Sequence, residues 1–147
     1  MPVQSGASAP VLFAGVPGTP ASAPARGASS GSLVIHVDIS PISATNGASI
    51  TSYHVAIDDG AAGAFVELQG ESLDTLALSG SLSTGVVQGR YYRVKYRGRN
   101  QIGFGAFSET AYILAADLPD QVVVSGPDAA LSATIVGTGL AITWALP

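Results

Sequence analysis

The 147-residue chain contains no cysteine, and this absence removes several kinds of chemistry at once. Without thiols there is no disulfide bond, no thiolate nucleophile and no cysteine-ligated zinc. The redox compartment stays open, because domains without cysteine occur on both sides of a membrane. The chain also lacks the Asn-x-Ser/Thr sequon, since Asn46 precedes Gly-Ala and Asn100 precedes Gln-Ile. Any glycan on this segment would therefore be attached to a Ser or Thr hydroxyl.

Charged residues and long apolar runs are scarce as well. Only 11% of the residues are charged and the formal net charge is −4, which argues against nucleic acid as a partner because phosphate binding requires a basic surface. No stretch approaches the ~18 consecutive apolar residues of a membrane helix, so we expect no membrane insertion in this segment. The residues after Met1 include no basic region, so we expect no signal peptide here. A secreted parent protein would carry its signal upstream.

The chain does contain a repeat at the length of a whole domain. Residues 8–17 align without gaps with residues 110–119 at an offset of 102, and residues 32–37 align with residues 139–144 at an offset of 107. A period near 100 residues is too long for a solenoid turn but suits tandem domains. Three parts follow in chain order: residues 1–15 as the last strand of a preceding domain, residues 16–116 as a complete domain, and residues 117–147 as the first two strands of a following domain.

Residues 16–116 consist mainly of short runs in which apolar residues alternate with other residues, and helical periodicity is nearly absent. Leu33, Ile35, Val37 and Ile39 alternate with other residues, a pattern that predicts a strand with one buried face. Further strands of the middle part are expected at residues 50–57, 65–68, 92–99 and 107–115 and within 73–87, with a proline-punctuated edge strand within 15–31 and a hairpin turn at 58–60. Residues 9–14 are expected to form a strand of the preceding part. Seven short strands in about 100 residues without a helix predict an all-β sandwich.

Several segments resemble a known family, and residues 92–108 do so most strongly. Residues 92–108 resemble the fibronectin type III segment that runs from strand F through the FG loop into strand G, with matches at Tyr92, Asn100, Gly103, Gly105 and Ser108. Val86 and Gly89 precede Tyr92 at the spacing of the family's tyrosine corner. Residues 53–55 resemble strand C, and residues 140–147 resemble strand B with its core tryptophan.

The resemblance implies an immunoglobulin-like antiparallel β-sandwich of the fibronectin type III kind, in tandem. It also implies a structural core that includes Val37, Tyr53, Tyr92, Val94 and Trp144. The chain departs from the family pattern at three places: Val37 stands where a tryptophan is usual, Gln88 replaces a proline and Gly98 replaces an alanine. These departures change core volume rather than topology, because cores tolerate apolar exchange when the pattern is kept.

No cluster of residues has the spacing of an active site. His36 and His54 flank inward-facing residues, so we expect both to lie at the surface, on opposite sheets, without a shared metal. Residues 58–60, Asp-Asp-Gly, lack the further oxygen ligands of a calcium loop, since residues 61–63 are Ala-Ala-Gly. Residues 103–105 lack the following helix of a phosphate loop, and no serine has a histidine base with an acidic partner. The sequence therefore predicts no enzyme activity, no metal site and no cofactor.

One surface feature stands out. Four of the six basic residues fall on one face of one predicted strand, about 7 Å apart, and form what we call the basic stripe: Arg93, Lys95, Arg97 and Arg99. In one interpretation the stripe is solvated and paired across strands with acids such as Asp58 and Glu109. In the other it docks an acidic protein, a glycan or an adjacent chain. Docking predicts that replacing Arg93, Lys95 and Arg97 by serine leaves thermal stability nearly unchanged and weakens assembly in a salt-sensitive way.

These observations favour a non-enzymatic structural or adhesive module. The expected role is a spacer or filament-forming segment of a tandem fibronectin type III protein, outside the cell or at its surface. Its expected partners are neighbouring domains or copies of the same chain. An accessory binding module of a secreted carbohydrate-active enzyme is an alternative, and so is a cytoplasmic scaffold.

Overall fold

The computed structural model describes residues 13–118, 131–136 and 139–144. The chain divides into two compact units, Met1–Asp117 and Leu118–Pro147, which are considered separately. Residues 9–12, part of the first predicted strand, lie outside the described residues, and Phe13 and Ala14 are not in a strand. The assignment of residues 1–15 to a preceding domain therefore stays a prediction.

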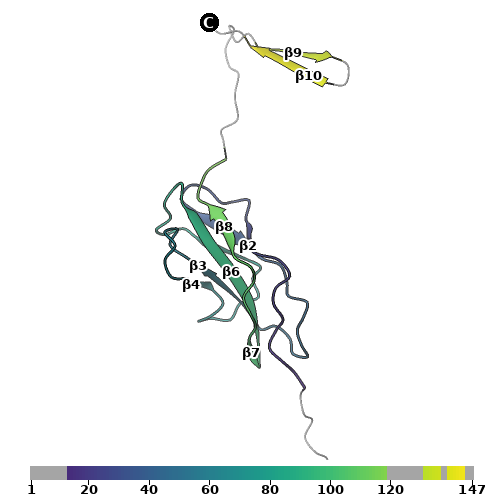
Figure 1. The fold of residues 1–147 in the computed structure, drawn as a ribbon, viewed down its shortest axis with the longest axis vertical. Helices are drawn as coiled ribbons and strands as arrows, with labels where there is room; N and C mark the ends of the chain where they lie inside the picture. Colours follow the sequence, from purple (N-terminus) through teal and green to yellow (C-terminus); the bar gives the residue numbers. More distant parts are fainter. Residues whose placement is uncertain (1–12, 119–130, 137–138, 145–147) are drawn as a thin grey trace, which may run out of the picture. The chain divides into compact units, whose positions relative to one another are not determined.

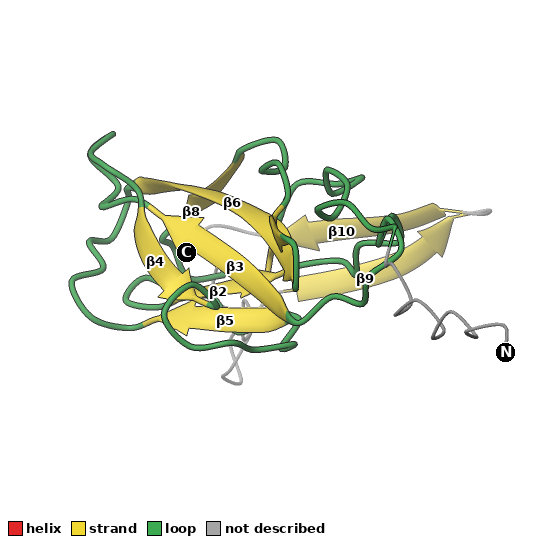
Figure 2. Cartoon of the chain, turned by 90° about the horizontal axis from the view of Figure 1, so that it is seen from below, coloured by secondary structure: helices red, strands yellow, loops and turns green. Residues whose placement is uncertain are grey.

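The first unit is a sandwich of two antiparallel sheets without a helix among its described residues (Figure 1). One sheet has the order β1-β2-β5, and the other has the order β4-β3-β6-β7 with β8 also paired to β6. Figure 2 shows β2 and β5 as a layer separate from β3, β4 and β6. The strands are β1 Ala25–Arg26, β2 Ile35–Asp38, β3 Ser52–Ile57, β4 Val66–Gln69, β5 Ser79–Leu82, β6 Tyr91–Asn100, β7 Gly103–Phe104 and β8 Ala111–Leu114.

Several strand ends differ from the sequence prediction. Leu33 is 66% exposed because pairing in the sheet begins only at Ile35, so it is not part of the core. Residues 58–60 do not form a tight hairpin turn, since the connection runs from β3 at Ile57 to β4 at Val66. The strand expected within 73–87 is limited to β5. In each case a tertiary partner decides where the strand begins and ends, and local sequence pattern does not report that partner.

The core lies between the sheets and is built from inward-facing residues of β2, β3, β6 and β8. Among those that the resemblance implied, Val37, Tyr53, Tyr92 and Val94 are buried. The side chain of Trp144 lies outside the described residues. Burial of side chains of this size contributes about 1.5–3 kcal/mol each. This core holds the two sheets face to face.

Tyrosine hydroxyls tie the core to the connecting loops. The Tyr92 hydroxyl accepts a hydrogen bond from the backbone N–H of Val87 at 2.8 Å, which is the tyrosine corner of sandwiches of this kind. The Tyr96 hydroxyl donates to the carbonyl of Ser40 at 3.0 Å. Gly98 leaves room for Ile42, because a Cβ at Gly98 would lie 2.8 Å from Ile42 Cδ1. This contact gives a reason for glycine where the family has alanine.

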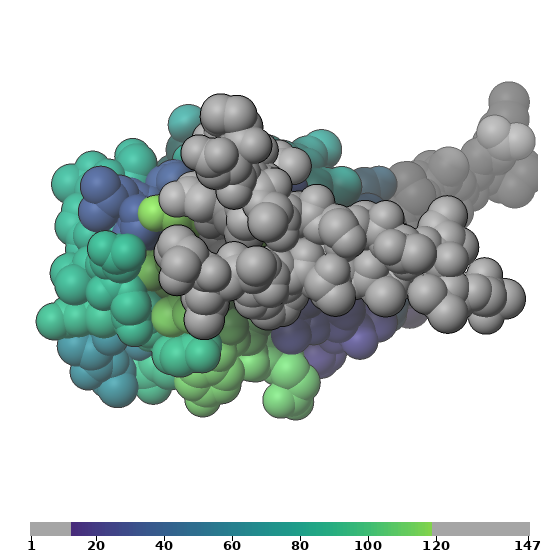
Figure 3. Space-filling view, turned by 90° about the horizontal axis from the view of Figure 1, so that it is seen from above, coloured from purple at the N-terminus to yellow at the C-terminus, as the bar shows by residue number. Residues whose placement is uncertain are grey.

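The chain enters and leaves the sandwich at opposite ends of β6. At the Asn100 end, Asn100 Nδ2 donates to the carbonyl of Gly15 at 2.8 Å. At the Tyr91 end, Tyr91 pairs with Leu114, and the N–H of Ser32 donates to Asp117 at 2.8 Å. A ten-residue strand spans about 30 Å. Figure 3 views the exit end, where the blue surface near residue 30 lies beside green surface near residue 115.

The described part of the second unit is one hairpin. β9 (Leu131–Val136) pairs antiparallel with β10 (Gly139–Trp144), with Leu131 opposite Trp144 and Ile135 opposite Leu140. Residues 140–144 of the segment that resembles strand B therefore lie in a strand.

Candidate interaction surface on the outer face of β3 and β6

The basic stripe lies on the outer face of the β4-β3-β6 sheet, as the alternation along the strand predicts. Along β6 the even-numbered residues, among them Tyr92, Val94 and Tyr96, are buried in the core. The four odd-numbered cations point the other way and are only partly exposed. Because β6 lies between β3 and β8, both edges of this strand are hydrogen-bonded within the sheet.

Three phenylalanine rings lie between the charged groups of the stripe: Phe65, Phe104 and Phe107. Lys95 Nζ lies 4.1 Å from the centroid of Phe65 and 4.3 Å from that of Phe107. Arg97 Cζ lies 4.1 Å from the centroid of Phe104 and 4.3 Å from that of Phe107. Arg93 and Arg99 contact one ring each, at 5.1 and 5.3 Å. Each cation–π contact of this kind contributes about 0.5–1 kcal/mol at exposed sites.

Carboxylates neutralise three of the four cations. Arg93 makes the tightest pair, since its Nε lies 2.7 Å from Asp58 Oδ2 and its backbone N–H donates to Asp58 Oδ1 at 2.8 Å. Arg97 Nη2 lies 3.6 Å from Glu71, and Arg99 Nη1 lies 3.1 Å from Asp74. The Asp58 side chain is 1% exposed, whereas Glu71 and Asp74 are about half exposed.

Of these three acids, the sequence predicts Asp58 as a partner of the stripe but not Glu71 or Asp74. Asp58 was expected to pair with the stripe and does so. Glu109 was expected as well, but no ion pair joins it to the stripe among residues 13–118. Lys95 likewise has no carboxylate within ion-pair distance in that range, and its partners are the two rings. Glu71 and Asp74 belong to a loop whose fold the local sequence does not predict.

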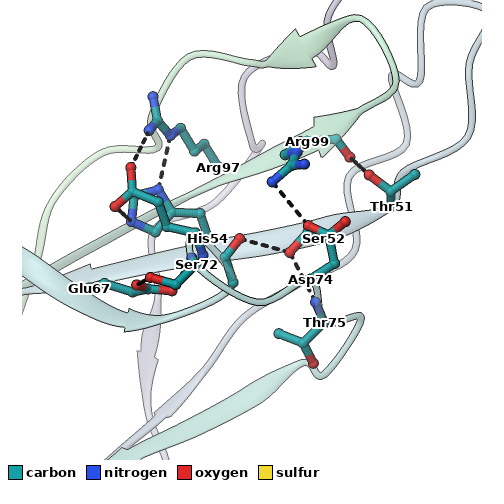
Figure 4. Close-up of polar contacts among 11 residues, drawn as sticks. Thr51, Ser52, His54, Glu67, Ser72, Asp74, Thr75, Arg97 and Arg99 are labelled. Atoms are coloured by element: carbon teal, nitrogen blue, oxygen red, sulfur yellow. Dashed lines mark hydrogen bonds and ion pairs between the residues drawn. The ribbon is translucent and has the colours of Figure 1, made fainter.

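Side-chain hydrogen bonds hold this loop, residues 70–78, against the sheet (Figure 4). Ser52 Oγ donates to the carbonyl of Gly70 at 2.8 Å and accepts from the N–H of Thr75 at 3.0 Å. Glu67 accepts from the N–H groups of Glu71 and Ser72 and from the Ser72 hydroxyl. These bonds, the Ser72 hydroxyl first, lower the pKa of Glu67. The loop thereby presents its carboxylates to the stripe.

His54 is buried, which corrects the prediction that it lies at the surface. It is on the outer face of β3, opposite Arg97 on β6, but only 3% of the residue is exposed. Its Nδ1 accepts a hydrogen bond from Arg97 Nε at 3.1 Å, and its Nε2 lies 3.5 Å from Glu71 Oε2 (Figure 4). Burial lowers the pKa of His54 and outweighs Glu71, which raises it. The loops that cover this face were not visible in the sequence pattern.

The described residues contain no cluster of three or more His, Asp or Glu residues suited to holding a metal ion. In the Asp-Asp-Gly segment both carboxylates are already engaged: Asp58 accepts from Arg93, and Asp59 accepts from the N–H groups of Ala61 and Gly63. These backbone bonds lower the pKa of Asp59. Gly103 and Phe104 form β7, so this glycine-rich segment is a hairpin.

The described part of the chain contains no helix with the length and hydrophobicity needed to span a membrane.

Solved structures with a similar fold include fibronectin type III domains. A human fourth FNIII domain has a TM-score of 0.62 and 18% identity, over 81% of this chain and 95% of its own. The chicken CNTN1 FN1–FN3 domains have a TM-score of 0.54 and 19% identity, over 86% of this chain and 40% of theirs. Titin domains A168–A170 have a TM-score of 0.58 and 14% identity over 71% of this chain, which spans only 34% of that structure.

No family model matches the sequence. No curated protein matches it either. The structure places residues 13–117 in the class of immunoglobulin-like, all-β sandwiches. Within that class the domain is fibronectin type III-like, as the residues of β6 and the following loop predicted.

Proposed function

We propose that this chain is a non-enzymatic structural or adhesive segment of a tandem fibronectin type III protein. The complete domain acts as a spacer or filament-forming unit, and its partners are neighbouring domains or copies of the same chain. We further propose that it works outside the cell or at the cell surface.

The positions of the chain ends in the sandwich carry this proposal. Entry near Asn100 and exit near Tyr91 lie at opposite ends of β6, about 30 Å apart for a ten-residue strand. Domains joined through such ends add their lengths, whereas adjacent ends would fold successive domains back on each other. The entry is also held firmly, since Gly15 N–H donates to the carbonyl of Asn46 and Gly18 N–H donates to that of Ala44.

The β9–β10 hairpin of the second unit supports the tandem arrangement. In the repeat alignment Trp144 corresponds to Val37. Val37 lies in β2 and pairs with Arg26 of the preceding strand, and Trp144 lies in β10 and pairs with Leu131 of the preceding strand. Both pairs are antiparallel. The hairpin is thus what the first two strands of a further domain would form.

The contacts of the basic stripe support its structural role over docking of an acidic protein or glycan. Its cations are partly buried against phenylalanine rings, and three have carboxylate partners. An acidic ligand would have to displace those partners. Docking would make assembly weaken with salt, and assembly that is equal at low and high salt would exclude it.

A two-domain chain tests the spacer role directly. The repeat aligns Pro119 with Pro17, so residues 1–119 joined to residues 18–147 place a second copy of the domain at the junction that the repeat defines. We expect small-angle X-ray scattering to show a maximum dimension about 30 Å longer than that of the 147-residue chain. Both copies should unfold with the midpoint of the single domain. An unchanged maximum dimension would contradict an in-line spacer.

A further inference from the structure

His54 lies on the outer face of β3, and side chains from several other elements surround it. The rings of Phe104 and Phe107 meet the imidazole edge-on, with centroids 5.7 and 5.5 Å away. Arg97 contacts the same two rings and also the imidazole. His54 and Arg97 therefore share one packed site, and a change at one must be accommodated by the other.

The hydrogen bond between them is possible in only one protonation state of the imidazole. Nδ1 accepts from Arg97 Nε at 3.1 Å, so the ring is neutral and carries its proton on Nε2. An imidazolium donates from both nitrogens. Its Nδ1–H would face the Nε–H of Arg97, which places two donors and two positive charges against each other.

Glu71 connects the same two groups. One of its oxygens lies 3.5 Å from His54 Nε2, and the other lies 3.6 Å from Arg97 Nη2. No hydrogen bond to His54 Nε2 is present in the described structure. A charged imidazole would attract the carboxylate and draw it from Arg97. Protonation thus weakens both polar contacts that hold the Arg97 guanidinium in place.

We propose that His54 is a proton-sensitive latch for the basic stripe: the neutral ring holds Arg97 over Phe104 and Phe107, and protonation releases the guanidinium and uncovers the two rings. The latch lies within one domain and does not depend on a tandem arrangement.

The charges around His54 come from three elements. Glu67 of β4 and Glu71 of the 70–78 loop favour the imidazolium, whereas Lys95 and Arg97 of β6 oppose it. Burial is the largest influence and lowers the pKa of His54 below its usual value near 6.5. The latch should therefore open at a pH below that value.

Nuclear magnetic resonance on the full 147-residue chain tests the latch. We would follow the imidazole signals of His54 and the solvent exchange of the Arg97 Nε–H from pH 8 to pH 4.5. We expect both to change with one midpoint. The protection of the Arg97 Nε–H, meaning its exchange rate relative to the intrinsic rate at the same pH, should be at least about tenfold lower below that midpoint, a loosening that corresponds to about 1.4 kcal/mol. His36 lies in the other sheet and provides an internal reference.

Two variants sharpen the result. His54→Gln keeps an acceptor for Arg97 but does not titrate, so the pH-dependent change at Arg97 should disappear. Glu71→Gln removes a carboxylate that favours the imidazolium, so the midpoint should move to lower pH. An Arg97 signal that stays constant while His54 titrates would overturn the latch, and so would a His54 that remains neutral until the domain unfolds. If His54→Gln does not fold, the wild-type titration alone decides between these outcomes.

Discussion

The two faces of β6 are packed by different physical means. On the inner face, Tyr92, Val94 and Tyr96 are buried among apolar side chains of both sheets. On the outer face, the basic stripe is packed by phenylalanine rings, carboxylates and a buried histidine. Apolar burial is non-directional and depends mainly on area, whereas the outer face depends on charge, geometry and protonation state. A strand with alternating cations can therefore be covered on both faces without a second apolar core.

The inner face should dominate stability. Replacing Tyr96 by alanine should lower the free energy of unfolding by about 3–5 kcal/mol, because it removes a buried ring and the hydroxyl bond to Ser40. Urea denaturation measures the change. Tyr112→Ala is the matched control, since Tyr112 is 67% exposed and should lose no more than about 0.5 kcal/mol. Equal losses would mean that Tyr96 is not part of the core.

Within the outer face, the buried carboxylate should matter more than the exposed one. Asp58→Ala should cost about 1.5–3 kcal/mol, because hydrogen bonds from the Arg93 side chain and backbone are lost. Asp74→Ala removes a half-exposed partner of Arg99 and should cost about 0–1 kcal/mol. Chemical denaturation of the two variants side by side provides the measurement. A larger loss for Asp74→Ala would contradict the pairing.

The aromatic contacts of the stripe can be isolated at Lys95. Lys95→Met keeps the aliphatic stem but removes the ammonium group above Phe65 and Phe107, so we expect a loss of about 1 kcal/mol. Arg90→Met is the control, since Arg90 is exposed and outside the stripe. An unchanged stability of Lys95→Met would instead agree with the docking prediction from sequence, in which stripe side chains are dispensable to the fold.

The smallest expected effect is the pH dependence from His54. Its pKa is lowered in the folded state by burial, so the unfolded chain binds the proton more tightly. The stability that depends on a neutral His54 is fully present above the pKa of the unfolded state, near 6.5. It is lost as the pH falls through the pKa of the folded state. Thermal unfolding between pH 7.5 and 5 should show a slope that His54→Gln flattens and His36→Gln does not. Carboxylates with lowered pKa, such as Glu67, lose their stabilising effect only at more acidic pH, so they do not account for this slope.

Period-two alternation accounts for the parts of the fold that were predictable. It placed Tyr92 and Val94 inward and the four cations outward, because successive side chains of any strand point to opposite faces. The tyrosine corner was predictable from its spacing to Val86 and Gly89. Leu33 was predicted wrongly by the same rule, since alternation continues past the residue at which pairing starts.

The amino-acid sequence by itself therefore determined the all-β class, the fibronectin type III-like pattern and the common face of the basic stripe, because these follow from local periodicity and spacing. Only the tertiary structure decided what covers that face. Phe65, Phe107 and Glu71 come from three separate loop segments, and each reaches the stripe through long-range packing and hydrogen bonds. For the same reason His54, which alternation alone places at the surface, is buried and holds Arg97.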